Sequence, residues 1–78
     1  MFLSIDRGSD QRQESSGRML FQARDRARRT ITVAMSLSAW ATVQQEAGAD
    51  PIAELEYLAR RGHWEPHEGK KVWQLDLL

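Results

Sequence analysis

Residues 52–73 read IAELEYLARRGHWEPHEGKKVW, and this stretch determines the fold that the sequence predicts. Its first half places Ile52, Leu55 and Leu58 at helical spacing, so one face of a helix is apolar. After this pattern come Arg60 and Arg61, and Gly62 follows them directly. Glycine tolerates a left-handed cap and the arginines suit the negative end of a helix dipole, so we expect the helix to stop there.

The second half of the stretch changes period and predicts a β-hairpin. Trp64 lies on one side of a polar loop, residues 66–71, and Val72 and Trp73 lie on the other side. Gly69 supplies the turn residue within that loop. Because an indole buries a large area, we expect both tryptophans of the hairpin, together with Trp40, to pack in or against the core.

Length and composition indicate one small domain. The chain has 78 residues, 41% of them hydrophobic, and contains no cysteine. A core of this size is close to the lower limit for independent folding, and no disulfide or thiolate metal site can support it. We therefore expect a second copy of the chain, in a homodimer, or another partner to add stability.

The net charge of zero conceals two halves of opposite sign. Residues 1–36 hold seven arginines and four acidic residues, whereas residues 37–78 hold four basic and seven acidic residues. Contact with nucleic acid is therefore expected from the N-terminal half.

The N-terminal residues predict little regular structure, although Phe2, Leu3 and Ile5 could form an edge strand instead of being loose. Residues 6–17 are rich in polar and turn-forming residues, and we expect a flexible segment over residues 1–17 before a domain over residues 18–78. The apolar start is soon interrupted by Asp6 and Arg7, so it is too short for a signal peptide. The sequence therefore favours a cytoplasmic location and no membrane contact.

A helix is expected over residues 18–29, with Ser15 or Ser16 as its cap. Its second half is the densest positive run in the chain. Arginine binds phosphate through two parallel hydrogen bonds, and each neutralised phosphate releases counterions. The candidate nucleic-acid-binding residues are Arg24, Arg26, Arg28 and Arg29, with Lys70 and Lys71 in the C-terminal loop.

The middle of the chain predicts a strand and two helices. Residues 30–35 alternate polar and β-branched residues, with Ile31, Val33 and Met35 inward and Thr30, Thr32 and Ala34 outward. Ser36 or Ser38 is expected to cap a helix over residues 37–47, whose buried stripe would be Leu37, Trp40, Ala41 and Val43. Gly48 would end this helix, while Asp50 would cap the next and Pro51 would begin it.

The order helix, strand, helix, turn, helix and hairpin resembles a winged helix-turn-helix DNA-binding domain. The residues that carry the resemblance are Leu55, Leu58, Gly62 and Trp64, and residues 69–71 would form the wing. The resemblance implies an α+β fold with three helices, one short strand and a C-terminal hairpin. It also implies a small, dimeric transcriptional regulator that binds double-stranded DNA.

The third helix departs from this family's pattern. It would present Glu54 and Glu56, which phosphates repel. This departure favours DNA contact by the basic residues outside the helix. It also supports an alternative, in which Glu54, Glu56 and Tyr57 dock on another protein and the chain is a non-catalytic inhibitor or adaptor.

Residues 28–35, followed by two helices, are also similar to ribbon-helix-helix regulators. In that family, strands from two chains pair in the major groove. Thr30, Thr32 and Ala34 would then face the bases.

Catalysis and metal binding have little support in the sequence. His63, Glu65 and His67 would share one face of a regular strand, but Pro66 and the loop interrupt it. No nucleophile–base pair or phosphate-binding glycine loop is recognisable. We expect no enzyme activity, no cofactor and no metal.

Overall fold

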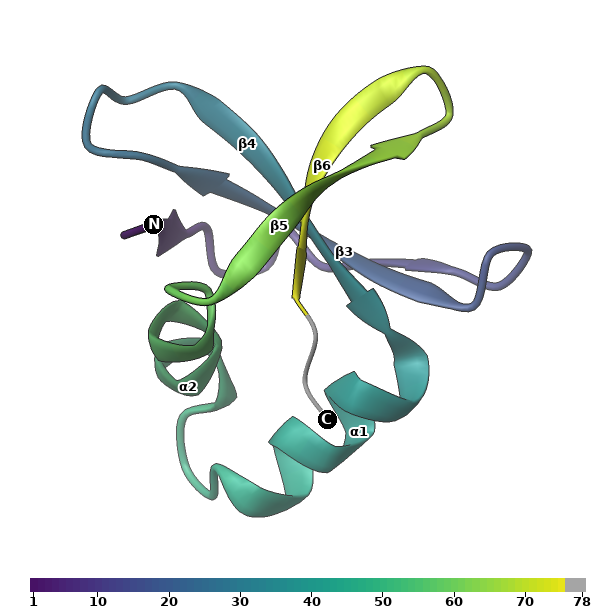
Figure 1. Ribbon diagram of the computed structural model, residues 1–78. Helices are drawn as coiled ribbons and strands as arrows, with labels where there is room; N and C mark the ends of the chain where they lie inside the picture. The colour runs from purple at the N-terminus through teal and green to yellow at the C-terminus, as the bar shows by residue number, and fades with distance from the viewer. Residues whose placement is uncertain (76–78) are drawn as a thin grey trace.

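The computed structural model describes residues 1–75 and combines a six-stranded sheet with two helices (Figure 1). The strands occur in the order β1-β3-β4-β6-β5 across the sheet, and β2 also pairs with β3. The elements are β1 (Ser4–Ile5), β2 (Gln11–Gln13), β3 (Arg18–Arg24), β4 (Thr30–Ser36), α1 (Leu37–Glu46), α2 (Pro51–Leu58), β5 (Gly62–His67) and β6 (Lys70–Leu75).

This architecture overturns the expected winged-helix fold, because residues 18–29 form no helix. Residues 18–24 are β3 and pair with β4 over seven consecutive positions. Met19, Phe21 and Ala23 face the core with the two-residue period of a strand, and Leu20 is buried on the opposite face. A strand buried on both faces lacks clean alternation, and the run Met-Leu-Phe therefore fitted a helix equally well.

The two hairpins are joined by a short parallel pairing. The β3–β4 hairpin and the β5–β6 hairpin meet where Val33 pairs with Trp73 and Ala34 with Gln74. Figure 1 shows the hairpins diverging from this crossing, with both of their turns on the side opposite the helices. In a ribbon-helix-helix regulator, this strand would pair with the same strand of a second chain. Here β4 lies inside the sheet, because it pairs with β3 along its whole length and with β6 at Val33 and Ala34.

The helix boundaries agree with the capping residues that the sequence offers. Ser36 accepts a hydrogen bond from the amide of Ala39 at 3.1 Å, and Asp50 accepts one from Ala53 at 3.2 Å. Pro51 is the first residue of α2, where a missing N–H costs nothing. Gly48 has a φ of 65°, as expected for the residue that ends α1.

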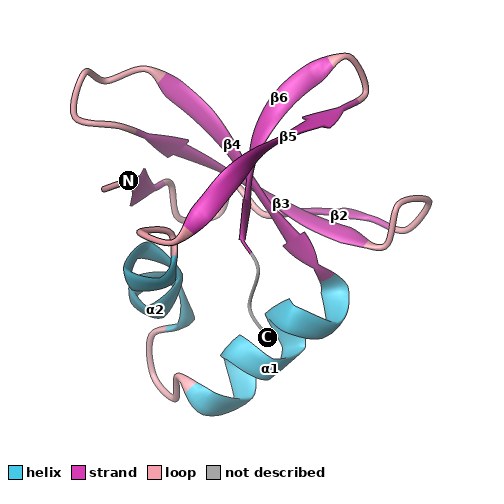
Figure 2. Cartoon of the chain, viewed as in Figure 1, coloured by secondary structure: helices cyan, strands magenta, loops and turns pink. Residues whose placement is uncertain are grey.

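The core lies between one face of the sheet and the two helices, which cover that face together (Figure 2). Phe21 is buried and meets Trp40 edge-to-face, with ring centroids 5.0 Å apart. The expected stripe of α1 is only partly correct: Val43 is buried, Leu37 and Trp40 are partly buried, and Ala41 is exposed. Ala39, which was not expected in the stripe, is buried. The buried core residues are Leu3, Ile5, Met19, Phe21, Ala23, Ile31, Val33, Met35, Ala39, Val43, Leu55, Ala59, Trp73 and Leu75.

The opposite face of the sheet holds a second, smaller cluster of Leu20, Ala34 and Val72. Ala34 was expected to face outward, yet it is fully buried. The sheet curls enough for His67, on the edge strand β5, to reach across to Arg18 of β3, whose guanidinium lies 3.4 Å from the ring. This curvature encloses Leu20, Ala34 and Val72 on the face that the two helices do not cover.

The expected helix stop at Gly62 is wrong, because α2 ends at Leu58 with Ala59 as its cap, and Gly62 is the first residue of β5. Its φ is not in the left-handed region. Instead, a Cβ at this position would lie 2.6 Å from Nε1 of Trp73 and 2.7 Å from the backbone oxygen of Gln74. The position therefore requires glycine because the Trp73 ring and the neighbouring strand approach the backbone closely.

The N-terminal residues contact the sheet at several points. Ser4 and Ile5 pair with the end of β3, and residues 11–13 pair with its beginning. Between these strands, the Asp6 amide donates to the Gln22 carbonyl at 2.8 Å, and the Gln22 amide donates to the Ser9 hydroxyl at 3.0 Å. Within residues 1–75, neither helix has the length and apolar character needed to cross a bilayer.

Candidate nucleic-acid interface

The four candidate arginines lie in and beside the turn that joins β3 to β4, rather than on a helix. Asp25 organises this turn, because its carboxylate accepts the Arg29 amide and the Arg29 Nε–H, each at 2.9 Å. The backbone hydrogen bond from the Arg29 amide is the main cause of a lowered pKa for the Asp25 carboxyl. The turn thus presents Arg24, Arg26, Arg28 and Arg29 as exposed side chains on an ordered backbone.

Arg28 adopts a backbone conformation that favours glycine. Its φ is 63°, and its amide donates to the Asp25 carbonyl at 3.0 Å. A non-glycine residue in the left-handed region costs on the order of 1 kcal/mol. Strain of this kind concentrates at functional positions, so it points to a use for the Arg28 side chain.

The other two candidate cations, Lys70 and Lys71, begin β6. His67 pairs with Lys70, so only Glu68 and Gly69 form the turn, and the loop is shorter than the expected residues 66–71. Both turn residues have positive φ, 52° and 78°, as in a type I′ turn.

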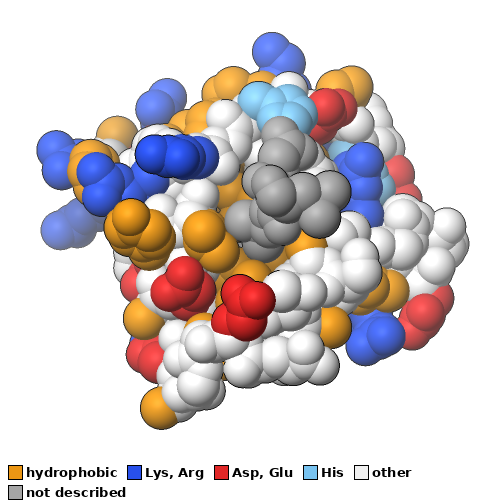
Figure 3. Space-filling view, turned by 60° about the horizontal axis from the view of Figure 1, so that its bottom comes forward, with side chains coloured by type: hydrophobic (Ala, Val, Ile, Leu, Met, Phe, Trp, Pro, Cys, Tyr) orange, Lys and Arg blue, Asp and Glu red, His pale blue; other side chains and the backbone are white. Residues whose placement is uncertain are grey.

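The parallel pairing of β4 with β6 directs both basic turns to the end of the molecule opposite the helices, where the two hairpins diverge and His67 lies beside Arg18, at the other end of β3 from Arg24. Residues 24–29 carry four arginines and one aspartate, and residues 67–71 carry two lysines and one glutamate. We call these two segments the cationic end. In Figure 1 both turns point away from the helices, and Figure 3 shows Lys and Arg side chains gathering most densely at its upper left.

Aromatic side chains extend this surface along one flank. The guanidinium carbon of Arg26 lies 4.7 Å from the centroid of the Phe2 ring, and that of Arg60 lies 4.8 Å from it. Arg60 also lies 5.8 Å from the ring centroid of Tyr57. These cation–π contacts hold an exposed phenyl ring in place and connect the β3–β4 turn to the end of α2.

The candidate protein-binding residues of α2 do not all face solvent. Tyr57 is 64% exposed, and Glu54 is also exposed in the first turn of the helix. Glu56, by contrast, accepts the amide N–H of Ile5 at 2.8 Å and thus fixes β1 to the helix. Glu54 and Tyr57 remain available to a partner, whereas Glu56 has a structural contact.

Trp64 is more exposed than we expected. It lies directly opposite Trp73 in the hairpin, with ring centroids 5.1 Å apart and planes at 75°. Its partner is buried, but Trp64 itself is 47% exposed. The nearby Pro66 could have indicated this, because proline within a sheet is confined largely to edge strands, and an edge strand covers its side chains less completely.

The histidines of β5 do not converge on a metal site. His63 Nε2 lies 2.6 Å from a Glu65 carboxylate oxygen. His67 instead turns toward β2 and β3, with Nε2 2.9 Å from Gln13 Oε1. Within residues 1–75, no three acidic, histidine or cysteine side chains are close enough to share an ion.

Comparison with known proteins gives no family for this chain, since no protein-family model, curated protein or solved structure matches it. The chemistry of the surface is therefore the basis for a function.

Proposed function

We propose that this chain is a small DNA-binding regulator that holds phosphates with its cationic end. The observation that carries the proposal is the parallel pairing of β4 with β6, which directs both basic turns, with Arg24, Arg26, Arg28, Arg29, Lys70 and Lys71, to the side of the molecule opposite the helices. Contacts to phosphate fix a protein on DNA without reading its sequence, so such a surface needs no recognition helix. The proposal keeps the expected homodimer and cytoplasmic location.

The backbone at Arg28 supports this proposal independently of charge. The chain has an arginine where glycine would relieve the conformation, so the guanidinium is retained at a cost in stability. Arg29, although bonded to Asp25 through Nε, has a side chain that is 79% exposed and still offers its terminal nitrogens.

Fluorescence anisotropy with a labelled duplex tests the proposal. We expect the wild-type chain to bind at about 50 mM salt and to lose roughly 10³-fold or more of its affinity by about 200 mM, as expected for roughly six phosphate contacts. Arg26→Glu and Arg28→Glu should weaken binding equally for unrelated duplex sequences. Absence of duplex binding at low salt would exclude the function.

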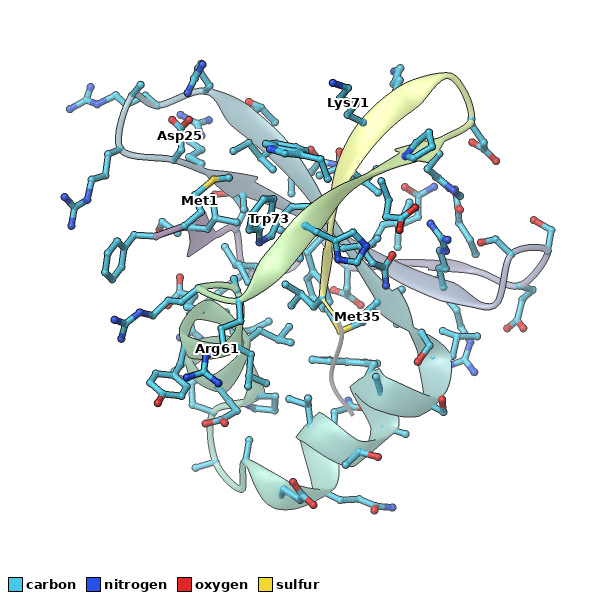
Figure 4. All side chains as sticks on the ribbon, viewed as in Figure 1. Met1, Asp25, Met35, Arg61, Lys71 and Trp73 are labelled. Carbon is cyan, nitrogen blue, oxygen red and sulfur yellow. The ribbon has the colours of Figure 1, made fainter. Side chains whose placement is uncertain are left out.

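Arg28→Gly provides a matched control for folding. It removes the guanidinium and relieves the left-handed backbone, so the melting temperature should rise while duplex affinity falls. Weaker binding by a more stable protein cannot be attributed to unfolding. Arg61→Glu, at the end of α2 and on the helix side of the molecule (Figure 4), should leave affinity nearly unchanged.

The exposure of Tyr57 favours a second candidate function, docking of α2 on another protein. In that case Tyr57→Ala and Glu54→Lys would abolish a complex with the partner and leave DNA binding unaffected. Glu56→Lys is unsuitable for this test because it also breaks the contact with Ile5.

A further inference from the structure

Trp64 is a large aromatic side chain that is left half-exposed by a chain with a small core. Its ring meets Trp73 edge-to-face, and Trp73 is fixed by the hydrogen bond from its Nε1 to the carbonyl of Ala59, at 2.8 Å. The exposed indole is therefore held on a rigid support. A ring that is already positioned loses little conformational freedom when a ligand stacks on it.

The register of the strands places Trp64 beside the cationic end. Val33, Trp73 and Trp64 occupy one row across β4, β6 and β5 on the same face of the sheet. Lys71 is two residues from Trp73 in the direction of the basic turns, which is about 7 Å along a strand. Figure 4 shows Lys71 and Trp73 both extending from β6 toward the side of the β3–β4 hairpin.

The other exposed aromatic residues have different surroundings. Phe2 has two guanidiniums within 5 Å of its centroid, and Tyr57 has Arg60 beside it. Within residues 1–75, the cation–π contacts involve Phe2 and Tyr57 only. Among these residues, Trp64 is thus the exposed aromatic that no cation covers, and its ring can accept another flat group.

We infer that Trp64 is a stacking platform for an unpaired nucleobase, and that the chain prefers single-stranded over double-stranded DNA. Lys71 and the arginines of the β3–β4 turn hold the phosphates on either side of that base. The inference rests on the proposed phosphate binding and adds the class of strand. In a duplex the bases are stacked on each other and cannot cover an indole, whereas every unpaired base offers its flat face.

Anisotropy with two probes of equal charge separates stacking from phosphate contact. The first is an oligothymidylate of about 12 nucleotides, and the second is an abasic strand with the same number of phosphates. Stacking of one base on an aromatic ring corresponds to roughly 5- to 150-fold in affinity, so the wild-type full chain should prefer the oligothymidylate within that range. It should also bind the oligothymidylate more tightly than a duplex of the same length.

Two substitutions assign the preference to the ring. Trp64→Ala should bring the two single-stranded probes to equal affinity without changing affinity for the abasic strand. Trp64→Phe should retain most of the preference, because it keeps an aromatic face. Circular dichroism and melting temperature of both variants show whether the hairpin is retained, and the phenylalanine variant keeps the test valid if the alanine variant does not fold.

Several results would overturn the inference. Equal binding of both single-stranded probes by the wild-type chain rejects stacking and leaves phosphate binding intact. A preference for the oligothymidylate over the abasic strand that persists in Trp64→Ala shows that Trp64 is not the stacking residue. A wild-type dimer that becomes a monomer in Trp64→Ala shows that a second copy covers the ring instead. Binding of neither strand rejects phosphate binding and the inference together.

Discussion

Trp73 donates its indole N–H to the carbonyl oxygen of Ala59 across 2.8 Å, and this bond connects the C-terminal hairpin to the end of α2. The last carbonyls of a helix have no partner within the helix, so an outside donor satisfies one of them. Trp73 is only 9% exposed, and Ala59 is fully buried. The hydrogen bond is therefore shielded from water, and its loss would leave the buried carbonyl of Ala59 without a donor.

The first prediction concerns this bond. Trp73→Phe keeps an aromatic ring but removes the donor, so the free energy of unfolding should fall by about 2–4 kcal/mol, from an unpaired carbonyl and a smaller side chain. Urea denaturation measures the change. Trp64→Phe is the control, because this ring is half-exposed, and it should cost less than about 1 kcal/mol. Similar losses in the two variants would show that the hydrogen bond contributes little.

The second prediction concerns the glycine against the same ring. Gly62→Ala would place a methyl group 2.6 Å from Trp73 Nε1, so either the ring or the strand must move. We expect a loss of about 1–3 kcal/mol, as for other overpacked positions. In a Trp73→Phe background part of the clash is absent, and Gly62→Ala should cost about 1 kcal/mol less. Strictly additive losses would indicate that the clash is with the Gln74 backbone alone.

Local signals in the sequence predicted the helices correctly, whereas the strands that depend on distant pairing could not be predicted from it. The caps Ser36 and Asp50 act on amides three residues away, so their short spacing identified both helices. The strand character of residues 18–24 depends on a neighbouring strand on each side and on burial of Leu20 by the curled sheet, and neither is visible in a short window.

The candidate site was predicted in part for the same reason. The sequence identified the basic residues, but a parallel pairing between segments about 40 residues apart determines that both basic turns lie opposite the helices. Phe2 was read as part of a flexible segment, although Arg26 and Arg60 both contact its ring. Trp64 was expected in or against the core because area favours burial of an indole; it packs on the buried Trp73, but its edge strand leaves it half-exposed.

The third prediction concerns the contact between Glu56 and β1. Glu56→Ala removes the acceptor of the Ile5 amide, and a partly buried N–H without a partner should cost about 1–3 kcal/mol. Hydrogen exchange at Ile5 should accelerate more than exchange within β3, since β1 has only two paired residues. Glu54→Ala, on the exposed side of α2, is the control and should leave that exchange unchanged. Unchanged protection of Ile5 in Glu56→Ala would exclude this role.

The fourth prediction is a pH dependence from Asp50. Its carboxylate accepts two hydrogen bonds from the Arg7 guanidinium, at 3.0 and 2.8 Å, and one from the Ala53 amide at 3.2 Å. The Arg7 contact, and then the Ala53 amide, hold the pKa of Asp50 below its ordinary value. A carboxyl whose pKa is lower when folded stabilises the fold above its unfolded pKa, about 3.9. This contribution disappears as pH falls through the folded value.

Asp50→Asn isolates this effect, because asparagine caps a helix about as well but has no charge to lose. The melting temperatures of the wild-type chain and the variant should differ most above about pH 5 and converge as the pH falls well below 3.9. Asp25, whose pKa is also lowered, titrates in both proteins, so the difference between the curves reports Asp50 alone. Because the Arg7 side chain is 64% exposed, about 1 M salt should reduce the difference at neutral pH. If the difference in melting temperature between the two proteins is constant across this pH range, the charge of the Asp50 carboxylate does not contribute to stability.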